Sequence, residues 1–244
     1  MRNNVLALKK SDRKLAILID PDKHSADQLF DFVSEVARLQ PDYILLGGSL
    51  IYKSSVDRAA KQIKATTNLP LVLFPGHFTQ LTDSVDFVLL LSLISGRNAD
   101  LLIGQHVLAA PMLKKLSNKL CPTGYMLIDG GNPTSVGYMS NTQPIPADKL
   151  DIAVCTAIAG EAIGLSCIYL DAGSGAMNPI SQEMIREVSE SVDIPIIVGG
   201  GIKEVSHIEK CWNNGANLVV VGNAMEENSS LAADLAKIKA DLSF

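Results

Sequence analysis

The sequence predicts a (β/α)8 barrel, in which eight parallel strands alternate with helices around a closed sheet. Three observations support this fold class. Eight short apolar runs have the character of buried parallel strands, helical segments separate most of them, and each of the last three ends in a glycine-rich loop. No Pro/Ser-rich or charged linker divides the chain, so residues 1–244 are expected to form one domain.

The first half of the chain supplies four predicted strands, at residues 15–20, 43–46, 71–74 and 87–91. Ser25 is expected to cap an amphipathic helix after the first strand, and residues 56–65 have helical character after the second. Only residues 76–86 separate the third strand from the fourth, which leaves little room for a crossover helix. A third helix is therefore doubtful.

The second half is predicted to continue the alternation through four more strands. Pro111 should kink or restart the helical stretch 101–116, and the long loop 130–146 is unusual unless it covers something. The expected strands begin at 124, 167, 196 and 218, and the expected helices span 150–163, 180–192, 204–213 and 231–242. The alternative fold is an open doubly wound sheet, but the GxGxxG signature expected after its first strand is missing.

Charge and cysteine usage exclude several classes of protein. The formal net charge of -5 and the lack of a basic cluster argue against a nucleic-acid surface. The four cysteines form no CxxC pair and no zinc-ligand spacing, which favours reduced thiols in a cytoplasmic protein. No signal peptide is recognisable, and the most apolar run, 87–94, is far shorter than the about 20 residues of a membrane span. Transient contact with a membrane surface stays compatible with this composition.

Three successive strand ends are predicted to form a phosphate site. The sequences are YLDAGSGA at 169–176, IIVGGG at 196–201 and LVVVGN at 218–223. Loops this poor in side chains expose backbone N–H groups, and a following helix directs its positive N-terminal dipole at the same place. Each loop alone is better explained by an ordinary βα turn. Together they match the position of the phosphate site in many (β/α)8 barrels, after the late strands.

Oxygen-bearing side chains at two neighbouring strand ends suggest a magnesium site. Asp20 ends the first predicted strand and Ser49 follows the second, so both could bind one hard cation whose remaining positions are filled by water and substrate phosphate. The alternatives are that Asp20 only caps the DPD turn and that Ser49 only caps the second helix. Asp22 and Asp129 also stand near strand ends.

Asp171 is the first candidate for chemistry, because an unneeded negative charge inside a phosphate loop would repel the ligand. A carboxylate there could bind the hydroxyls of a polyol phosphate or accept a proton from one. Tyr169, on the same strand face, could hold another oxygen, or could simply pack inside the barrel. Lys23 and Arg97 are candidates for a second anionic group or are solvated charges. His77, His106 and His207 lack a nucleophile partner and are expected to be surface or structural residues.

Seven motifs together resemble the geranylgeranylglyceryl phosphate synthase family, which includes the heptaprenylglyceryl phosphate synthases. They cover nearly the whole chain in order: LIDPDK (18–23), LLGGS (45–49), LFPG (73–76), SGRNADLLIGQH (95–106), YLDAGSGA (169–176), VGGGI (198–202) and VVVGNA (219–224). The resemblance implies a (β/α)8 barrel with an irregular third unit. It also implies magnesium-dependent transfer of a prenyl group from its diphosphate to the 3-hydroxyl of sn-glycerol 1-phosphate, with release of diphosphate, in ether lipid synthesis.

The resemblance also assigns residues. It gives magnesium to Asp20 and Ser49, and catalytic roles to Asp171 and Tyr169. The glycerol phosphate residues it implies are Tyr169, Leu170, Asp171, Ala172, Gly173, Ser174, Gly175, Gly200, Gly201, Gly222 and Asn223. A homo-oligomer is expected, and an apolar groove for the prenyl tail is expected to open near residues 76–86.

Two positions depart from the family pattern. Asp171 stands where the family usually has glutamate, so the reach of the missing methylene must be supplied by the backbone or a water. Leu18 stands where some members carry a lysine, so any phosphate contact from that position is absent.

Two other classes of function remain open. One is another phosphate-binding barrel enzyme, such as a sugar-phosphate isomerase or a thiamin-phosphate-type synthase, and the other is a scaffold that binds phosphate without catalysis. The combination of Asp20 and Ser49 with YLDAGSG, beside an apolar groove, distinguishes the prenyltransferase from the other barrel enzymes. A lack of turnover despite ligand binding would indicate the scaffold. The same reaction with a different prenyl chain length is a further alternative.

Overall fold

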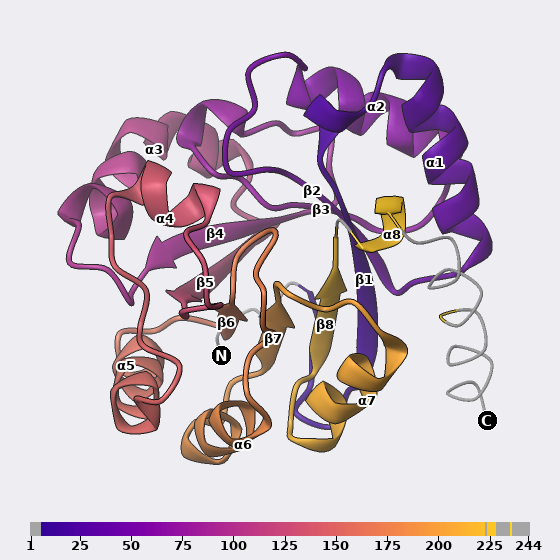
Figure 1. Cartoon of the computed structure of the whole chain (residues 1–244). Coiled ribbons are helices and arrows are strands. Elements are labelled where there is room, and N and C mark those ends of the chain that lie inside the picture. The colour runs from indigo at the N-terminus through magenta and orange to yellow at the C-terminus, as the bar shows by residue number, and fades with distance from the viewer. Residues whose placement is uncertain (1–5, 223, 228–234, 236–244) are drawn as a thin grey trace.

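The computed structural model describes residues 6–222, 224–227 and 235. Its eight strands close into a parallel barrel in the order β1 to β8, with helices around the outside (Figure 1). The strands are β1 Lys14–Ile19, β2 Tyr43–Leu46, β3 Leu71–Leu73, β4 Phe87–Leu93, β5 Leu120–Leu127, β6 Cys167–Asp171, β7 Ile196–Gly199 and β8 Leu218–Val221. The predicted fold class is confirmed.

The strands are apolar on both faces because each face packs against a different core. Along β6, Cys167 and Tyr169 point into the barrel, whereas Ile168 and Leu170 pack outward against the helices. Every residue of β2, β3, β7 and β8 is buried. Strands that are buried on both faces have continuous apolar sequences, which is why the strands could be located from the sequence.

Several of the helices begin where short polar side chains cap them. Ser25 forms a capping box with Gln28, and Ser55 and Ser181 accept hydrogen bonds from the first turns of α2 and α6. The helices are α1 Ala26–Arg38, α2 Val56–Thr66, α3 Gln105–Lys115, α4 Ser135–Ser140, α5 Leu150–Ala162, α6 Gln182–Ser191, α7 Val205–Asn213 and α8 Ala224–Glu227. The helix predicted at 231–242 lies outside the described residues.

The third βα unit lacks a full helix, as the short spacing predicted. Its only helical turn is the 3-10 segment Phe78–Gln80. Asp57 on α2 ties the connection down, because its carboxylate accepts hydrogen bonds from the hydroxyls of Thr82 and Ser84, each at 2.7 Å. The connection is thus held in place by polar contacts instead of helix packing.

Two further segments differ from the prediction or extend it. The helical stretch does not restart at Pro111: a π-helical turn, Asp100–Gly104, leads into α3, which continues through the proline. Pro111 and Val107 are exposed, so water can hydrate the carbonyl group that the proline leaves without a donor. The loop 130–146 contains α4, and its end is fixed by a parallel bridge between Ile145 and Ile128.

The amino-terminal end of the barrel is closed by the start of the chain. Leu6 and Leu8 are buried in the inner core, and the Tyr43 hydroxyl donates to the Leu6 carbonyl at 2.7 Å. All four cysteines are free thiols. In the part of the chain that the structure describes, no helix has both the length and the apolar character needed to cross a membrane.

Candidate active site

A cavity of about 980 Å³ opens at the carboxyl ends of the strands, and we call it the mouth cavity. Every strand, or the loop directly after it, contributes a lining residue: Leu18, Gly47, Phe74, Leu90, Tyr125, Tyr169, Gly200 and Val220, in order from β1 to β8. This end of a (β/α)8 barrel is where active sites form.

Seven of the residues predicted to bind glycerol phosphate line the mouth cavity. They are Tyr169, Asp171, Ser174, Gly175, Gly200, Gly201 and Gly222. Leu170 and Ala172 instead point into the outer core, and Gly173 contributes a backbone hydrogen bond to Asp171. Asn223 lies outside the described residues. The three glycine-rich strand ends are therefore brought together at one side of the cavity.

Glycine is required at position 200 because no side chain fits. Its φ is +81°, and a Cβ there would lie 2.7 Å from Asp171 Oδ1 and 2.6 Å from the Gly173 nitrogen. Gly222 is different, since a Cβ at that position would meet nothing closer than Leu18 at 3.7 Å. The absence of a side chain at 222 is thus not explained by packing, and it leaves the backbone accessible from the cavity.

Asp171 is held by two hydrogen bonds, one from the neighbouring strand β5 and one from the loop after its own strand. Tyr125 on β5 donates its hydroxyl proton to Oδ2 at 2.6 Å, and the Gly173 N–H donates to Oδ1 at 2.8 Å. Burial raises the pKa of Asp171, against the opposing effect of these two bonds. Burial and the neighbouring carboxylate raise the pKa of Tyr125 well above its usual value. A neutral tyrosine therefore faces a carboxylate of increased basicity.

Sequence reasoning missed Tyr125, because it lies inside a strand and not at a strand end. Its partner across the sheet is Tyr169 on β6, and both side chains point into the barrel. The signal that could have identified Tyr125 is its position directly opposite Tyr169 on the neighbouring strand. Using that signal requires the β5–β6 register.

Tyr125 and Tyr169 form an aromatic cluster with Phe74, the residue that directly follows β3. The Phe74 ring stacks on Tyr169 with centroids 5.1 Å apart, and the two tyrosine rings meet edge to face at 5.6 Å. A Cβ at Gly199 would lie 2.5 Å from the Tyr169 hydroxyl, so glycine is needed there to seat the ring. The cluster packs as barrel core and also lines the cavity.

Asp20 and Ser49 both line the mouth cavity, on the side opposite the β6 strand end. Asp20 also caps the 3-10 turn Pro21–Lys23, since its Oδ1 accepts from the Asp22 N–H at 3.0 Å. A Cβ at Gly48 would lie 2.9 Å from Asp20 Oδ2, so the carboxylate rests on the backbone just before Ser49. The alternative that Ser49 caps α2 is wrong, because Ser55 is the cap.

These two residues fit a magnesium ion that also binds substrate. Magnesium is commonly held by one or two carboxylates, with waters and substrate phosphates completing the octahedron. Within the described residues, no three Asp, Glu, His or Cys side chains gather into a site built from protein ligands alone. Asp129 does not line the cavity, and its Oδ1 accepts from the Gly131 N–H at 2.9 Å.

Asp22 fixes the segment that follows Ser49. Its carboxylate accepts backbone N–H bonds from Tyr52 at 2.8 Å, Lys53 at 3.1 Å and Ser54 at 2.7 Å. Burial acts to raise the pKa of Asp22, but these bonds outweigh it and the pKa is lowered. Asp22 therefore ties the turn after β1 to residues 52–54, which follow Ser49 in the chain.

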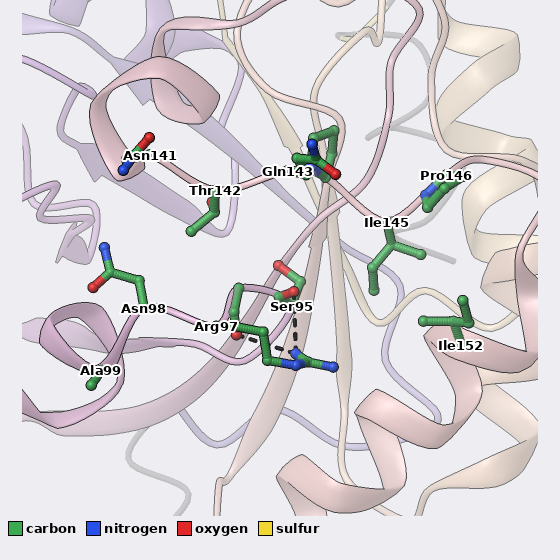
Figure 2. Close-up of a pocket in the computed structure, with 12 residues that line it drawn as sticks. Ser95, Arg97, Asn98, Ala99, Asn141, Thr142, Gln143, Ile145, Pro146 and Ile152 are labelled. Carbon is green, nitrogen blue, oxygen red and sulfur yellow. Dashed lines mark hydrogen bonds between the residues drawn. The ribbon is translucent and has the colours of Figure 1, made fainter.

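The two candidate cations for a second anionic group lie in different places. Lys23 lines the mouth cavity, together with His77, His106 and Lys203, which sequence reasoning left out of the site. Arg97 lines a separate cavity of about 620 Å³ between residues 95–99 and 141–146 (Figure 2). Its guanidinium folds back on its own loop and donates to the Gly96 carbonyl at 3.2 Å. The structure thus separates Arg97 from the glycine-lined strand ends.

The remaining wall of the mouth cavity is apolar. It is built by segments that the sequence marked as irregular, the connection after β3 and the loop 130–146. The apolar lining residues from these segments and their neighbours are Leu50, Ile51, Phe78, Leu81, Leu91, Leu101, Ala109, Val136 and Met139. The cavity therefore joins a glycine-lined region to an apolar region.

Comparison with known proteins identifies relatives over nearly the whole chain. The model of the PcrB family matches residues 9–240. A geranylgeranylglyceryl phosphate synthase of Chitinophaga pinensis is 49% identical over 93% of this chain and 90% of its own length. One of Spirosoma linguale is 48% identical over 94% of this chain and 93% of its own.

A solved structure shows the same fold with a ligand. It is (S)-3-O-geranylgeranylglyceryl phosphate synthase from Thermoplasma acidophilum in complex with its substrate sn-glycerol-1-phosphate, with a TM-score of 0.85 and 28% identity over 92% of this chain and 91% of that one. Together with the two bacterial relatives, it confirms the resemblance drawn from the seven motifs. The chain belongs to the PcrB family, as a relative of the geranylgeranylglyceryl phosphate synthases.

Proposed function

We propose that the protein transfers a geranylgeranyl group from geranylgeranyl diphosphate to the 3-hydroxyl of sn-glycerol 1-phosphate. The products are geranylgeranylglyceryl phosphate, an ether lipid precursor, and diphosphate. One observation supports this assignment above the others. A single cavity joins three glycine-rich strand ends, suited to a small phosphate ester, to an apolar wall suited to a prenyl chain.

The glycerol phosphate is proposed to bind at the carboxyl ends of β6, β7 and β8. Gly200, Gly201 and Gly222 let the phosphate approach the backbone, as phosphates do at such strand ends. Tyr169 and Asp171 then face the glycerol hydroxyls. Because the phosphate and the hydroxyls are held at separate points, the nucleophilic oxygen has one favoured orientation.

The residues proposed to hold magnesium are Asp20 and Ser49. When bound, the ion would neutralise charge on the diphosphate and so favour its departure. Lys23 and Lys203 line the same cavity and are suited to contact anionic oxygens of the two substrates. We therefore propose that the diphosphate binds between the candidate metal site and the glycerol phosphate.

The prenyl tail is proposed to lie along the apolar wall formed by the connection 76–81, the π-helical turn Asp100–Gly104 and α4. Contact with the prenyl tail would bury the side chains of Phe78, Leu101 and Met139. This wall argues against the second candidate, a sugar-phosphate isomerase or thiamin-phosphate-type synthase, since a polar second substrate would leave these side chains without a role.

The assay is extraction of labelled product into organic solvent. Labelled sn-glycerol 1-phosphate, magnesium and protein are incubated with prenyl diphosphates from C15 to C35. Label should enter the organic phase with the C20 donor more readily than with the others. Equal or better transfer from the C35 donor would support the same reaction with a longer prenyl donor. No transfer from any donor would favour a sugar-phosphate isomerase or thiamin-phosphate-type synthase.

Two further assignments accompany this function. We place the enzyme in the cytoplasm, in keeping with its four free thiols. We also propose a homo-oligomer in which a second copy covers exposed apolar side chains on α3 and α5, among them Val107, Leu108 and Ile158. Light scattering would measure the mass of the particle in solution and so its number of subunits. The alternative is that the same side chains make transient contact with a membrane surface.

A further inference from the structure

The Tyr125 hydroxyl is a polar group of the mouth cavity to which the proposed function gives no role. Tyr125 lines the cavity and directs its single proton at Asp171 Oδ2, 2.6 Å away. A phenol carries one donor and two acceptor lone pairs. Because the proton is committed to Asp171, the oxygen can only accept a hydrogen bond from anything that reaches it from the cavity.

Asp171 itself is closely restrained. Its side chain is only 7% exposed, and each oxygen already accepts one bond, from Tyr125 or from the Gly173 N–H. The position that a Gly200 Cβ would occupy is 2.7 Å from Oδ1, so the loop after β7 packs against that oxygen. The carboxylate is therefore fixed between three strands and cannot advance toward a substrate without losing these contacts.

We propose that Tyr125 is a catalytic residue that passes the proton of the substrate hydroxyl to Asp171. This inference depends on the proposed function. The hydroxyl oxygen of glycerol phosphate forms its bond to prenyl C1 while the bond from C1 to the diphosphate oxygen breaks, and diphosphate leaves with the electron pair. The substrate proton moves to Tyr125 Oη as the tyrosine's own proton moves to Asp171 Oδ2. Tyr125 is regenerated neutral, and Asp171 ends protonated.

The electrostatics of the pair suit such a relay. Burial raises the pKa of Asp171, which increases its affinity for the arriving proton. The pKa of Tyr125 is raised well above normal, by burial first and then by Asp171, so a free tyrosinate is disfavoured and both protons should move together. The other ionisable side chains that line the cavity are Tyr169, Asp20, Lys23, Lys203, His77 and His106.

The relay also answers a question raised by the sequence. Asp171 is one methylene shorter than the glutamate usual at its position, and a backbone group or a water was expected to supply the missing reach. The Tyr125 hydroxyl, hydrogen-bonded to the carboxylate and lining the cavity, supplies it from a side chain of the neighbouring strand.

The first test removes one oxygen atom. With geranylgeranyl diphosphate, magnesium and saturating sn-glycerol 1-phosphate, Tyr125→Phe should lower the single-turnover rate by about 10²- to 10³-fold, the range of general acid–base catalysis. The Kd for glycerol phosphate should change little. Asp171→Asn and the double variant should show the same loss as Tyr125→Phe, because residues that act as one unit are not additive.

A matched control removes a buried tyrosine hydroxyl outside the site. Tyr43→Phe deletes the bond to the Leu6 carbonyl at the opposite end of the barrel, and it should leave the turnover rate unchanged. Thermal unfolding of each variant shows that the folded protein was assayed. A Tyr125→Phe rate above roughly half that of the wild type, or losses that multiply in the double variant, would overturn the relay.

The second test distinguishes a relay from a tyrosine that only orients Asp171. In mixtures of H2O and D2O, two protons moving in one step make the wild-type single-turnover rate a curved function of the deuterium fraction. If only one proton moves, the plot of rate against deuterium fraction is a straight line. That result would reject the relay and would leave Tyr125 only the role of orienting Asp171. This measurement needs no variant. A wild type that is inactive with every donor would instead reject the proposed function itself.

Discussion

The carboxylate of Asp171 occupies space that any side chain at Gly200 would need, since a Cβ there would stand 2.7 Å from Oδ1. The candidate base of β6 is therefore positioned by the lack of a side chain on the loop after β7. Gly200 also has φ +81°, a conformation that L-residues adopt at a cost of about 1–2 kcal/mol.

We expect Gly200→Ala to displace Asp171 and to lower turnover by at least about tenfold, because a 1 Å misplacement can cost a hundredfold in rate. Gly164→Ala is the matched control: its φ is +103°, but a Cβ there meets nothing within 4 Å. Both variants should be less stable in urea unfolding. Only Gly200→Ala should lose activity under conditions in which both variants are folded. Equal activity in the two variants would show that the contact with Asp171 does not matter.

Gly222 offers a test of phosphate approach. A Cβ at this position is accommodated in the free protein, 3.7 Å from Leu18. Gly222→Val should therefore fold but weaken glycerol phosphate binding by about 1.5–3 kcal/mol, the value of one hydrogen bond to a charged group. Calorimetry measures the affinity, and the affinity of Gly222→Ala should lie between that of the wild type and that of Gly222→Val. Unchanged affinity in a folded Val variant would mean that no ligand approaches this strand end.

Asp20→Asn tests the candidate metal site. The amide oxygen can still cap the Pro21–Lys23 turn, so the fold should be retained while the charged ligand is lost. The magnesium concentration for half-maximal activity should rise by on the order of a hundredfold. Titrating activity with magnesium measures this, and superimposable wild-type and variant curves would exclude Asp20 as a ligand.

The stability contributed by Asp22 should depend on pH. Its pKa in the folded protein is below the ordinary 3.8, so its contribution is complete at neutral pH and is lost as pH falls below that value. Asp22→Asn has no such titration and should show a smaller drop in Tm between pH 7 and pH 3. The Tm difference between the two proteins should therefore be largest at neutral pH and should shrink only at the acid end. Parallel Tm curves for the two proteins would show that Asp22 titrates alike when folded and unfolded.

The parts of the molecule that could be predicted from the sequence are those decided by local patterns. Strands buried on both faces have unbroken apolar runs, and Ser25 caps α1, as its place before an amphipathic helical pattern suggested. Strand-end residues such as Asp20 and Gly200 could be assigned to the cavity because parallel strands all end at the same edge. These inferences need no knowledge of which strand pairs in which register.

The parts that could not be predicted depend on contacts between strands or on side-chain direction. The bond from Tyr125 to Asp171 requires the β5–β6 register, which an apolar run does not reveal. Arg97 follows β4 and looked suited to the site, but its guanidinium is satisfied by its own loop. Ser49 resembled a cap of α2, yet Ser55, six residues later and directly before the helix, is the cap.

The last prediction concerns stereochemistry, and it follows from the separation of the phosphate and hydroxyl contacts. The glycine-lined strand ends of β7 and β8 lie on one side of Asp171, and Tyr125 of β5 lies on the other. A glycerol phosphate held at the glycines can extend toward the Tyr125–Asp171 pair in one sense only. The sn-glycerol 3-phosphate enantiomer, anchored at the same phosphate position, would direct its free primary hydroxyl away from that pair and from the donor carbon.

We therefore expect kcat/KM for sn-glycerol 1-phosphate to exceed that for the 3-phosphate by at least about a hundredfold, because near-attack alignment supplies much of the rate. The preference should appear mainly in kcat, since both enantiomers place a phosphate at the same glycines. Competition between the two, each with a different isotopic label, measures the ratio in one reaction. A ratio near one would mean that the hydroxyls are not read by Tyr125, Tyr169 and Asp171, and that the phosphate alone positions the substrate.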